Sequence, residues 1–229
     1  MDLTVAAASD LQVAFTEIGE MFTAETGHAV TFSFGSTGNL TTQIENGAPF
    51  DVFAAANVAF VDRLIAGGFM DEETKQLYGV GRIVLANSVS AGTDAQQLED
   101  LLDPEVTHVA IANPEHAPYG VAAKEALESA GLWDDLQPKL VYGENIRQAL
   151  QFVESGNAEV GIVALSIAEV DTITWTLIDD SLHNPLLQAM GVVSASEHQD
   201  AAMEFVEFVT GPEGREILDQ YGFAPPELP

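Results

Sequence analysis

The sequence predicts an α/β protein built from mainly parallel sheets. Short apolar, β-rich runs alternate with segments of helical periodicity along most of the chain, and glycines follow several of the helical segments. No repeat, low-complexity tract or long linker interrupts this alternation. The pattern is typical of sheets that carry helices on their faces. In such sheets ligands bind at the carboxyl ends of the strands, where the topology switches direction.

Each element can be justified from its pattern. The clearest helix is 11–25, because Leu11, Phe15, Ile18 and Phe22 fall on one helical face. The expected strands are 3–8, 30–34, 52–55, 82–86, 106–112, 139–142, 160–164, 175–178 and 186–193. The expected helices are 11–25, 40–46, 58–66, 96–102, 120–130, 146–155 and 199–209.

The composition limits the possible partners. The 229 residues carry 36 acidic side chains against seven lysines and arginines, for a formal net charge of −29. This field repels nucleic acids and anionic membranes. The hydrophobic content of 47% excludes a disordered acidic tail. An acidic surface adapted to high salt explains the charge better than a docking function, because net charge reports on solubility more than on a site.

The sequence leaves the compartment open. It contains no cysteine and no apolar run long enough to span a membrane. We expect no signal peptide in this sequence, since Met1 is followed at once by Asp2 and a strand-like run. The protein is therefore either cytoplasmic or a secreted chain whose leader has been removed.

Three strand-to-helix junctions carry the functional prediction. They are Ala6-Ala7-Ala8-Ser9-Asp10, Phe34-Gly35-Ser36-Thr37-Gly38 and Tyr142-Gly143-Glu144-Asn145-Ile146. A helix N-terminus offers backbone N–H groups without intrahelical partners and a partial positive charge, so it suits an anion. Ser9 and Ser36 add hydroxyl groups. Several such junctions in one cleft would surround an oxyanion with neutral donors, which indicates a binding protein.

Each junction also has a structural interpretation. Ser9 suits a plain N-cap, and Ser36 lies between glycines in what reads as a polar turn. Tyr119 follows the loop Asn113–Pro118 and either packs or points its hydroxyl at an oxyanion.

The sequence argues against metal ligation and catalysis. The histidines show no metal-ligand spacing, and there is no Walker A, Gly-x-Gly-x-x-Gly or Gly-x-Ser-x-Gly motif. A hydrolase using Ser9 or Ser36 is disfavoured, because no motif places a base beside either residue. We therefore expect no enzyme activity, no cofactor and no directly ligated metal.

Taken together, the segments resemble the molybdate-binding proteins of bacterial molybdenum uptake. The similarity covers most of the chain in order: Ala6–Ser9, Gly35–Leu40, Gln43–Phe53, Ala112–Gly120, Gly143–Ile146, Gln151–Gly156, Val163–Ser166 and the ending Tyr221–Pro225. Each piece alone is weak, but the ordered set is specific.

This resemblance implies a two-lobed periplasmic solute-binding fold of type II. Residues 1–79 and 190–229 would form lobe 1, residues 80–189 would form lobe 2, and the ligand would lie in the cleft between them. The resemblance further implies a monomer, periplasmic or lipid-anchored outside the cytoplasm, that delivers molybdate or tungstate to the permease of a membrane ABC transporter.

The resemblance also implies the ligand residues. Ser9 and Ser36 would donate hydroxyl and backbone N–H bonds, and Asp10 only its N–H, because a carboxylate opposes a dianion. The Tyr119 region and the N–H of Ile146 would complete the cage. Molybdenum or tungsten would be bound only as the oxyanion. Many members carry a tyrosine at the position of Ala164, whereas this chain resembles the subgroup with Tyr119.

A cage made only of donors accepts fully ionised molybdate, tungstate or sulfate. It disfavours hydrogen phosphate, whose proton finds no acceptor. Two alternatives stay open. The ligand is sulfate or another tetrahedral oxyanion, or the chain is a ligand-sensing domain of the same fold, although no DNA-binding segment is present.

Overall fold

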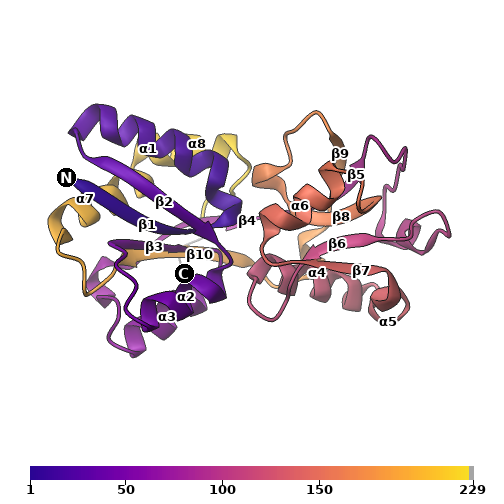
Figure 1. Ribbon diagram of the computed structural model, residues 1–229, viewed down its shortest axis with the longest axis horizontal. Helices are drawn as coiled ribbons and strands as arrows, with labels where there is room; N and C mark the ends of the chain where they lie inside the picture. Colours follow the sequence, from indigo (N-terminus) through magenta and orange to yellow (C-terminus); the bar gives the residue numbers. More distant parts are fainter. Residues whose placement is uncertain (227–229) are drawn as a thin grey trace. The chain divides into compact units, whose positions relative to one another are not determined.

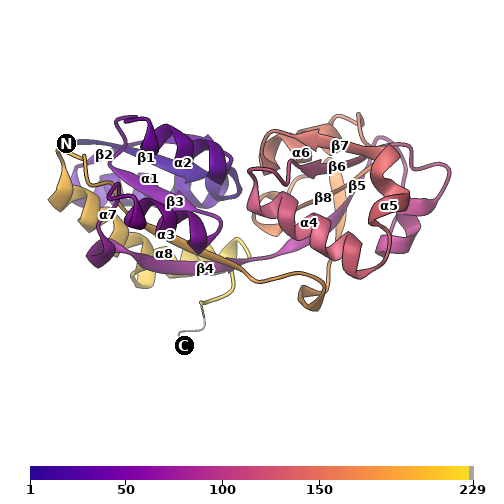
Figure 2. The ribbon, with the colours of Figure 1, turned by 90° about the horizontal axis from the view of Figure 1, so that it is seen from below.

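The computed structural model describes residues 1–226, which form two units with one sheet each. One unit comprises Met1–Gly81 and the described residues from Leu187 onward, and the other comprises Arg82–Leu186. The chain leaves the first unit through β4 (Gln76–Gly81) and returns through β10 (Leu186–Val192) (Figure 2). The crossings expected from the sequence lie after residue 79 and before residue 190. Residues 227–229 of its lobe 1 lie outside the described residues.

The first unit is a five-stranded sheet of order β2-β1-β3-β10-β4. Its first three strands are parallel, and β10 runs antiparallel to β3. Helices α1 and α8 lie on one face and α2 and α3 on the other (Figure 1). The elements that complete this unit are β1 (Asp2–Ala8), η1 (Ser9–Leu11), α1 (Gln12–Thr26), β2 (Ala29–Gly35), α2 (Thr37–Glu45), β3 (Val52–Ala55), α3 (Val58–Ala66), η2 (Glu72–Thr74), α7 (Gln199–Thr210) and α8 (Pro212–Gln220).

The second unit is a five-stranded sheet of order β7-β6-β8-β5-β9. Strands β7, β6 and β8 are parallel, whereas β5 is antiparallel to both β8 and β9. Its elements are β5 (Ile83–Ser88), η3 (Leu98–Leu102), β6 (Val109–Ala112), α4 (Pro118–Ser129), α5 (Trp133–Leu136), η4 (Gln137–Lys139), β7 (Leu140–Gly143), α6 (Ile146–Glu154), β8 (Val160–Ala164), η5 (Leu165–Ile167), β9 (Ile173–Leu177) and η6 (Asp180–Leu182).

The α/β class expected from the sequence is confirmed, and each sheet is mixed around a parallel core of three strands. In both units the first strand of this core is central, the second lies to one side and the third to the other. The segment 96–102, expected as an α-helix, is a 3-10 helix over Leu98–Leu102, and the sequence reading missed β4, α5 and α8.

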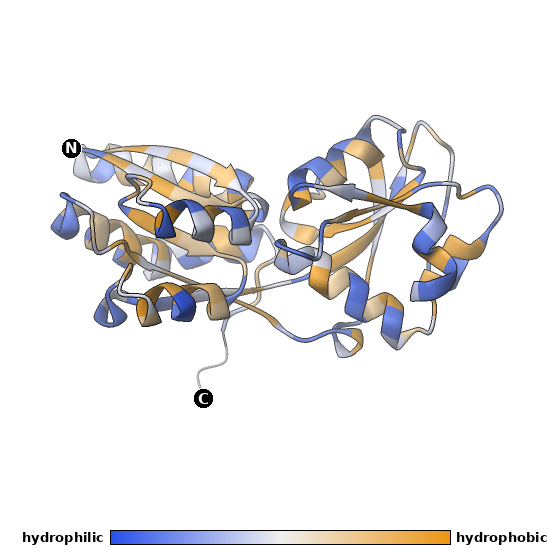
Figure 3. Ribbon diagram, turned by 60° about the horizontal axis from the view of Figure 1, so that its bottom comes forward, coloured by the Kyte–Doolittle hydropathy of each residue, from blue (hydrophilic) through white to orange (hydrophobic). Residues whose placement is uncertain are grey.

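Apolar side chains on both faces of the first sheet hold its helices in place. On one face, Leu40 and Ile44 of α2 pack with Phe53 of β3 in a buried cluster. On the other face the ring of Phe15 in α1 lies 6.0 Å from the ring of Phe205 in α7. Figure 3 shows the same division, with apolar residues along the strands and hydrophilic stretches on the helices. Within residues 1–226, no helix is long and apolar enough to cross a membrane.

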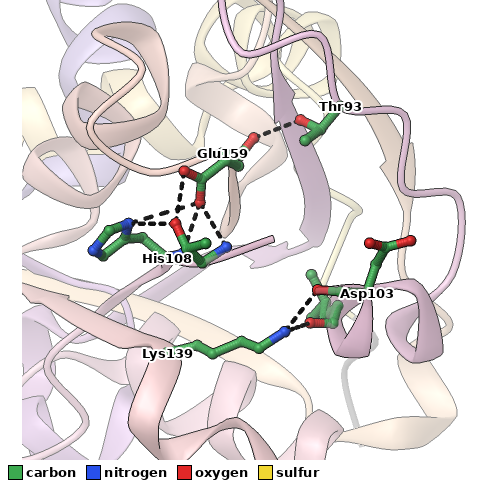
Figure 4. A network of polar contacts seen from close by, with 7 residues as sticks. Thr93, Asp103, His108, Lys139 and Glu159 are labelled. Atoms are coloured by element: carbon green, nitrogen blue, oxygen red, sulfur yellow. Dashed lines mark hydrogen bonds and ion pairs between the residues drawn. The ribbon is translucent and has the colours of Figure 1, made fainter. Parts of the chain in front are cut away.

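Glu159, just before β8, is hydrogen-bonded to the residues just before β6 (Figure 4). Its Oε2 accepts hydrogen bonds from the backbone N–H groups of His108 at 2.6 Å and Thr107 at 3.0 Å, and its Oε1 accepts one from the Thr107 hydroxyl at 3.0 Å. Burial works to raise the pKa of the Glu159 carboxyl. The bonds from His108 and Thr107 favour the ionised form and leave the pKa below its ordinary value.

This network predicts that Glu159→Gln lowers the free energy of unfolding by about 1 kcal/mol at pH 7, because the introduced NH₂ group faces donors and the carboxylate is partly exposed. A lowered folded-state pKa stabilises the fold above the unfolded-state pKa of about 4.3, and that stabilisation is lost as the pH falls through the folded value. The difference in the free energy of unfolding between the variant and the parent should therefore be smaller below about pH 4 than at pH 7.

Urea unfolding at both pH values measures this difference, with Glu169→Gln as a control at an exposed acid of the same unit. An equal difference in the free energy of unfolding at both pH values would contradict this role of the ionised Glu159 carboxylate.

Candidate functional site

Ser9 and Ser36 lie at the carboxyl ends of neighbouring parallel strands. The last residues of β1 and β2, Ala8 and Gly35, are paired in register, and the two serines follow them directly. Both serines are buried, with 3% and 4% of their surface exposed. The sheet therefore brings the first two predicted junctions side by side.

This point is the topological switch of the first unit. The chain leaves β1 into η1 and α1, and it leaves β2 into α2. Because α1 and α2 lie on opposite faces of the sheet (Figure 1), the connections diverge between β1 and β2. A crevice at the carboxyl ends of two such strands is where open α/β sheets bind ligands.

Neither serine hydroxyl acts as a helix cap. The N-cap of η1 is Ala8, that of α1 is Leu11, and neither makes a side-chain cap bond. Ser36 occupies the N-cap position of α2, but its hydroxyl does not bond to that helix terminus. The interpretation of Ser9 as a plain N-cap is therefore wrong, and capping does not explain Ser36 either.

The second unit repeats the arrangement with Tyr119 and Ile146. Ala112 and Gly143, the last residues of β6 and β7, are paired in register. Tyr119 is the second residue of α4, which follows β6, and Ile146 is the first residue of α6, which follows β7. The two residues are buried, and α4 and α6 lie on opposite faces of the sheet (Figure 1). This is the switch point of the second unit.

Two glycines permit this close packing. A Cβ added to Gly120 would lie 2.2 Å from the carbonyl oxygen of Ala112, and one added to Gly143 would lie 2.6 Å from the backbone nitrogen of Ala149. Both contacts are far shorter than van der Waals distance, and backbone atoms cannot move aside cheaply. The N-termini of α4 and α6 can therefore approach the strand ends only with glycine at these positions.

The N-terminus of α6 is held by reciprocal side-chain bonds. Asn145 is the N-cap, and its Oδ1 accepts a hydrogen bond from the backbone N–H of Gln148 at 3.0 Å. The Oε1 of Gln148 accepts in turn from the backbone N–H of Glu144 at 2.7 Å. The N–H of Ile146 remains among the first N–H groups of the helix, which have no carbonyl partner inside it.

Asp10 is fully buried beside the switch point of the first unit, and its carboxylate is hydrogen-bonded to a residue of another strand. Oδ2 of Asp10 accepts a hydrogen bond from Nε2 of Gln188 in β10 at 2.9 Å. Gln188 was not predicted from the sequence. The available signal was a lone amide in the apolar run Leu186-Leu187-Gln188-Ala189-Met190, since a polar residue inside a buried strand needs a partner.

The structure thus groups Ser9, Asp10 and Ser36 in one unit and Tyr119 and Ile146 in the other. The donors in these groups are hydroxyl and backbone N–H groups. Across residues 1–226, no three histidine or acidic side chains are placed to hold a metal ion. The chemistry available at both switch points is hydrogen-bond donation to an acceptor-rich ligand.

Known proteins are similar to this chain in both sequence and fold. The family described as bacterial extracellular solute-binding protein matches residues 3–224. The molybdate-binding protein ModA of Rhodobacter capsulatus is 36% identical, over 97% of this chain and 88% of its own length. The putative ABC transporter substrate-binding lipoprotein YvgL of Bacillus subtilis is 31% identical, over 96% of this chain and 85% of its own length.

A solved structure resembles the whole chain. The periplasmic molybdate-binding protein of Azotobacter vinelandii superimposes with a TM-score of 0.92 at 30% identity, and the match covers 98% of this chain and all of that one.

Proposed function

The chain belongs to the family of bacterial extracellular solute-binding proteins, and from this premise we propose that it binds molybdate and delivers it to a membrane ABC transporter. The observation that carries the ligand class is the repeated switch point. In each unit, two strand-to-helix junctions follow paired strand ends, and the residues proposed as ligands there, Ser9 and Ser36 or Tyr119 and Ile146, are buried. The chain is a binding protein, not an enzyme, and uses no cofactor.

The proposed site closes one cage from both units around the oxyanion. Ser9 and Ser36 donate hydroxyl and backbone N–H bonds from the first unit, and Asp10 contributes only its N–H. Tyr119 and the N–H of Ile146 donate from the second unit. The metal atom contacts no protein atom directly, because every donor forms its hydrogen bond with an oxygen of the anion.

A cage of this kind selects by protonation and size. Molybdate, tungstate and sulfate offer only acceptors at neutral pH, whereas hydrogen phosphate brings a proton that meets another donor. Molybdate and tungstate are nearly equal in size, so we propose that both bind. Smaller sulfate fills the same cage less well.

The relatives support an extracytoplasmic location, since one is named a lipoprotein and another periplasmic. We propose that the protein works there as a monomer and docks on the transporter's permease. The resemblance to a ligand-sensing domain gains no support from any further observation on this chain.

The acidic surface is proposed to be an adaptation to high salt. Within residues 1–226, Asp10 and Asp51 are the only acidic residues that are buried. With seven basic residues for 36 acids, most carboxylates have no lysine or arginine partner. The surface is therefore a dense field of like charges that salt would screen.

Calorimetric titration tests the proposed function. We expect molybdate and tungstate to bind at one site per chain, sulfate more weakly, and hydrogen phosphate weakest. Molybdate at about a hundred times its Kd should add about 2.7 kcal/mol to the free energy of unfolding. An absence of binding heat together with an unchanged melting temperature in saturating molybdate and tungstate would refute the proposal. If sulfate bound more tightly than molybdate, the proposed ligand would be sulfate and not molybdate.

Ser36→Ala should weaken molybdate binding by about 1.5–3 kcal/mol, the range for a hydrogen bond to a charged group. This corresponds to a loss of about tenfold or more in affinity. Because the Ser36 hydroxyl does not cap α2, a lost helix cap should not be the cause of the weaker binding. Thr42→Ala is the matched control, since it removes a hydroxyl of the same helix that bonds to the Gly38 carbonyl. A variant with reduced stability and parental affinity would exclude Ser36 as a ligand.

Tyr119→Phe keeps the buried ring and removes only the phenolic donor. We expect molybdate affinity to fall by about 1.5–3 kcal/mol. Tyr142→Phe removes a hydroxyl from an exposed side chain of the same unit and should bind as the parent does. Equal affinity of Tyr119→Phe and the parent would mean that the ring packs while only backbone groups bind the anion.

Raising sodium chloride from low concentration to about 1 M should raise the melting temperature. The reason is that the Debye length falls to about 3 Å and the self-repulsion of the surface is screened. Scanning calorimetry without ligand measures the effect. A melting temperature that stays flat or falls over this range would contradict the salt adaptation.

A further inference from the structure

Three buried polar side chains form a chain of hydrogen bonds inside the first unit. Nε2 of Gln188 donates to Oδ2 of Asp10 at 2.9 Å, and the Tyr78 hydroxyl lies 2.6 Å from Oε1 of Gln188. The same hydroxyl lies 3.0 Å from the carbonyl oxygen of Ala55 at the end of β3. Asp10, Tyr78 and Gln188 are buried, and no more than 3% of the surface of each residue is exposed.

The polarity of this network requires an amide in the middle. The phenol donates to the amide oxygen, and the amide N–H donates to the carboxylate, so Gln188 must donate and accept at once. Burial of Tyr78 and then the nearby charge of Asp10 hold the pKa of the phenol well above its ordinary value, which keeps the hydroxyl a donor. A buried carboxylate is costly for the fold. Stability alone would favour an apolar residue at position 10.

The network joins three segments that matter for binding. Asp10 is the middle residue of η1, the turn that begins with Ser9. Tyr78 belongs to β4, and Gln188 to β10. These are the two strands through which the chain passes from one unit to the other. Asp10 and Gln188 are 178 residues apart in sequence, so the bond between them is a tertiary link from the turn to a crossover strand.

We infer that Gln188 is a positioning residue for the oxyanion: it holds the Asp10 carboxylate on β10, so that the Ser9–Leu11 turn presents donors rather than a negative charge. This inference rests on the proposed function. Without the Gln188 bond, the carboxylate is held less firmly on β10 and can compete with the ligand for nearby N–H groups and repel the dianion. Through Tyr78 and Gln188 the turn is also fixed to both crossover strands.

An exchange of the two functional groups tests this. Gln188→Glu places two carboxylates against each other and should weaken molybdate binding at least about tenfold. The double variant Asp10→Asn/Gln188→Glu remakes the amide–carboxylate bond with donor and acceptor exchanged, and the introduced glutamate can still accept from Tyr78. It has the same net charge as the parent and should recover affinity to within about threefold. Asp10→Asn alone keeps an acceptor for Gln188 and removes a negative charge from the turn, so it should bind molybdate more tightly than the parent.

The control is Asn87→Leu. Asn87 is another buried amide, in β5 of the second unit, and it bonds to Ala95 and pairs with Val160 at the amino end of β8. Its loss should lower the melting temperature and leave molybdate affinity unchanged.

Calorimetric titration with molybdate and unfolding without ligand are measured on all five proteins. A parent that does not bind molybdate refutes the proposed function itself, independently of the variants. If the parent binds, parental affinity of Gln188→Glu would overturn the positioning role and leave a structural one. Failure of a folded double variant to recover affinity would overturn it as well. If Gln188→Glu does not fold, a folded double variant that binds molybdate more than about threefold more weakly than the parent would overturn the positioning role.

Discussion

The proposed ligand-binding residues of both units depend on one constraint, the register between the first two strands of each parallel core. Ala8 pairs with Gly35, and Ala112 pairs with Gly143. Because these strands end together, the segments that follow them start at the same edge of the sheet and lead to helices on opposite faces. A shift of register by one residue would turn every side chain of a strand to the other face and separate the paired junctions. The pairing is held in turn by apolar packing on both faces, including the cluster around Leu40, Ile44 and Phe53.

The proposed ligand is a dianion, and the chain carries a net charge of −29. These are compatible because the two effects act over different distances. The field of exposed carboxylates is screened beyond about 10 Å at 0.1 M salt, and beyond a shorter distance in stronger salt. The donors at the switch points act at hydrogen-bond distance in buried surroundings, where screening is weak and electrostatic interactions are stronger. The carboxylate that lies beside the switch point, that of Asp10, is the one engaged by Gln188.

Local sequence patterns were enough to predict most of the fold. Strands 52–55 and 160–164 and helix 58–66 are found with the predicted bounds, because continuous apolar runs or a clear helical pattern end there at polar or turn residues. β4 was missed, since Gly79 and Gly81 break its apolar pattern. α8 was missed because Pro212 and Gly214 stand at its start and read as a turn, although proline suits the first helical position.

The candidate site was predictable only in part, for a physical reason. The junctions are local features, so the sequence indicates Ser9, Ser36 and Ile146 directly. Capping and ligand roles of Ser9 look the same in sequence, and only the backbone geometry shows that Ala8 takes the cap position. The bond of Asp10 to Gln188 depends on how β10 enters the sheet beside β3, which no local pattern encodes.

The two units reach the same arrangement with different chemistry. The first presents two serines after its strand ends, and the second presents a tyrosine and a helix N-terminus fixed by Asn145 and Gln148. Short serine side chains keep an anion close to the backbone N–H groups, whereas the longer phenol of Tyr119 carries its donor further from its helix. A tetrahedral anion needs donors from several directions, and neither kind of side chain supplies them all. In the proposed site the donors come from both units, so we expect affinity to depend on the strands that join the units as well as on the groups that touch the anion.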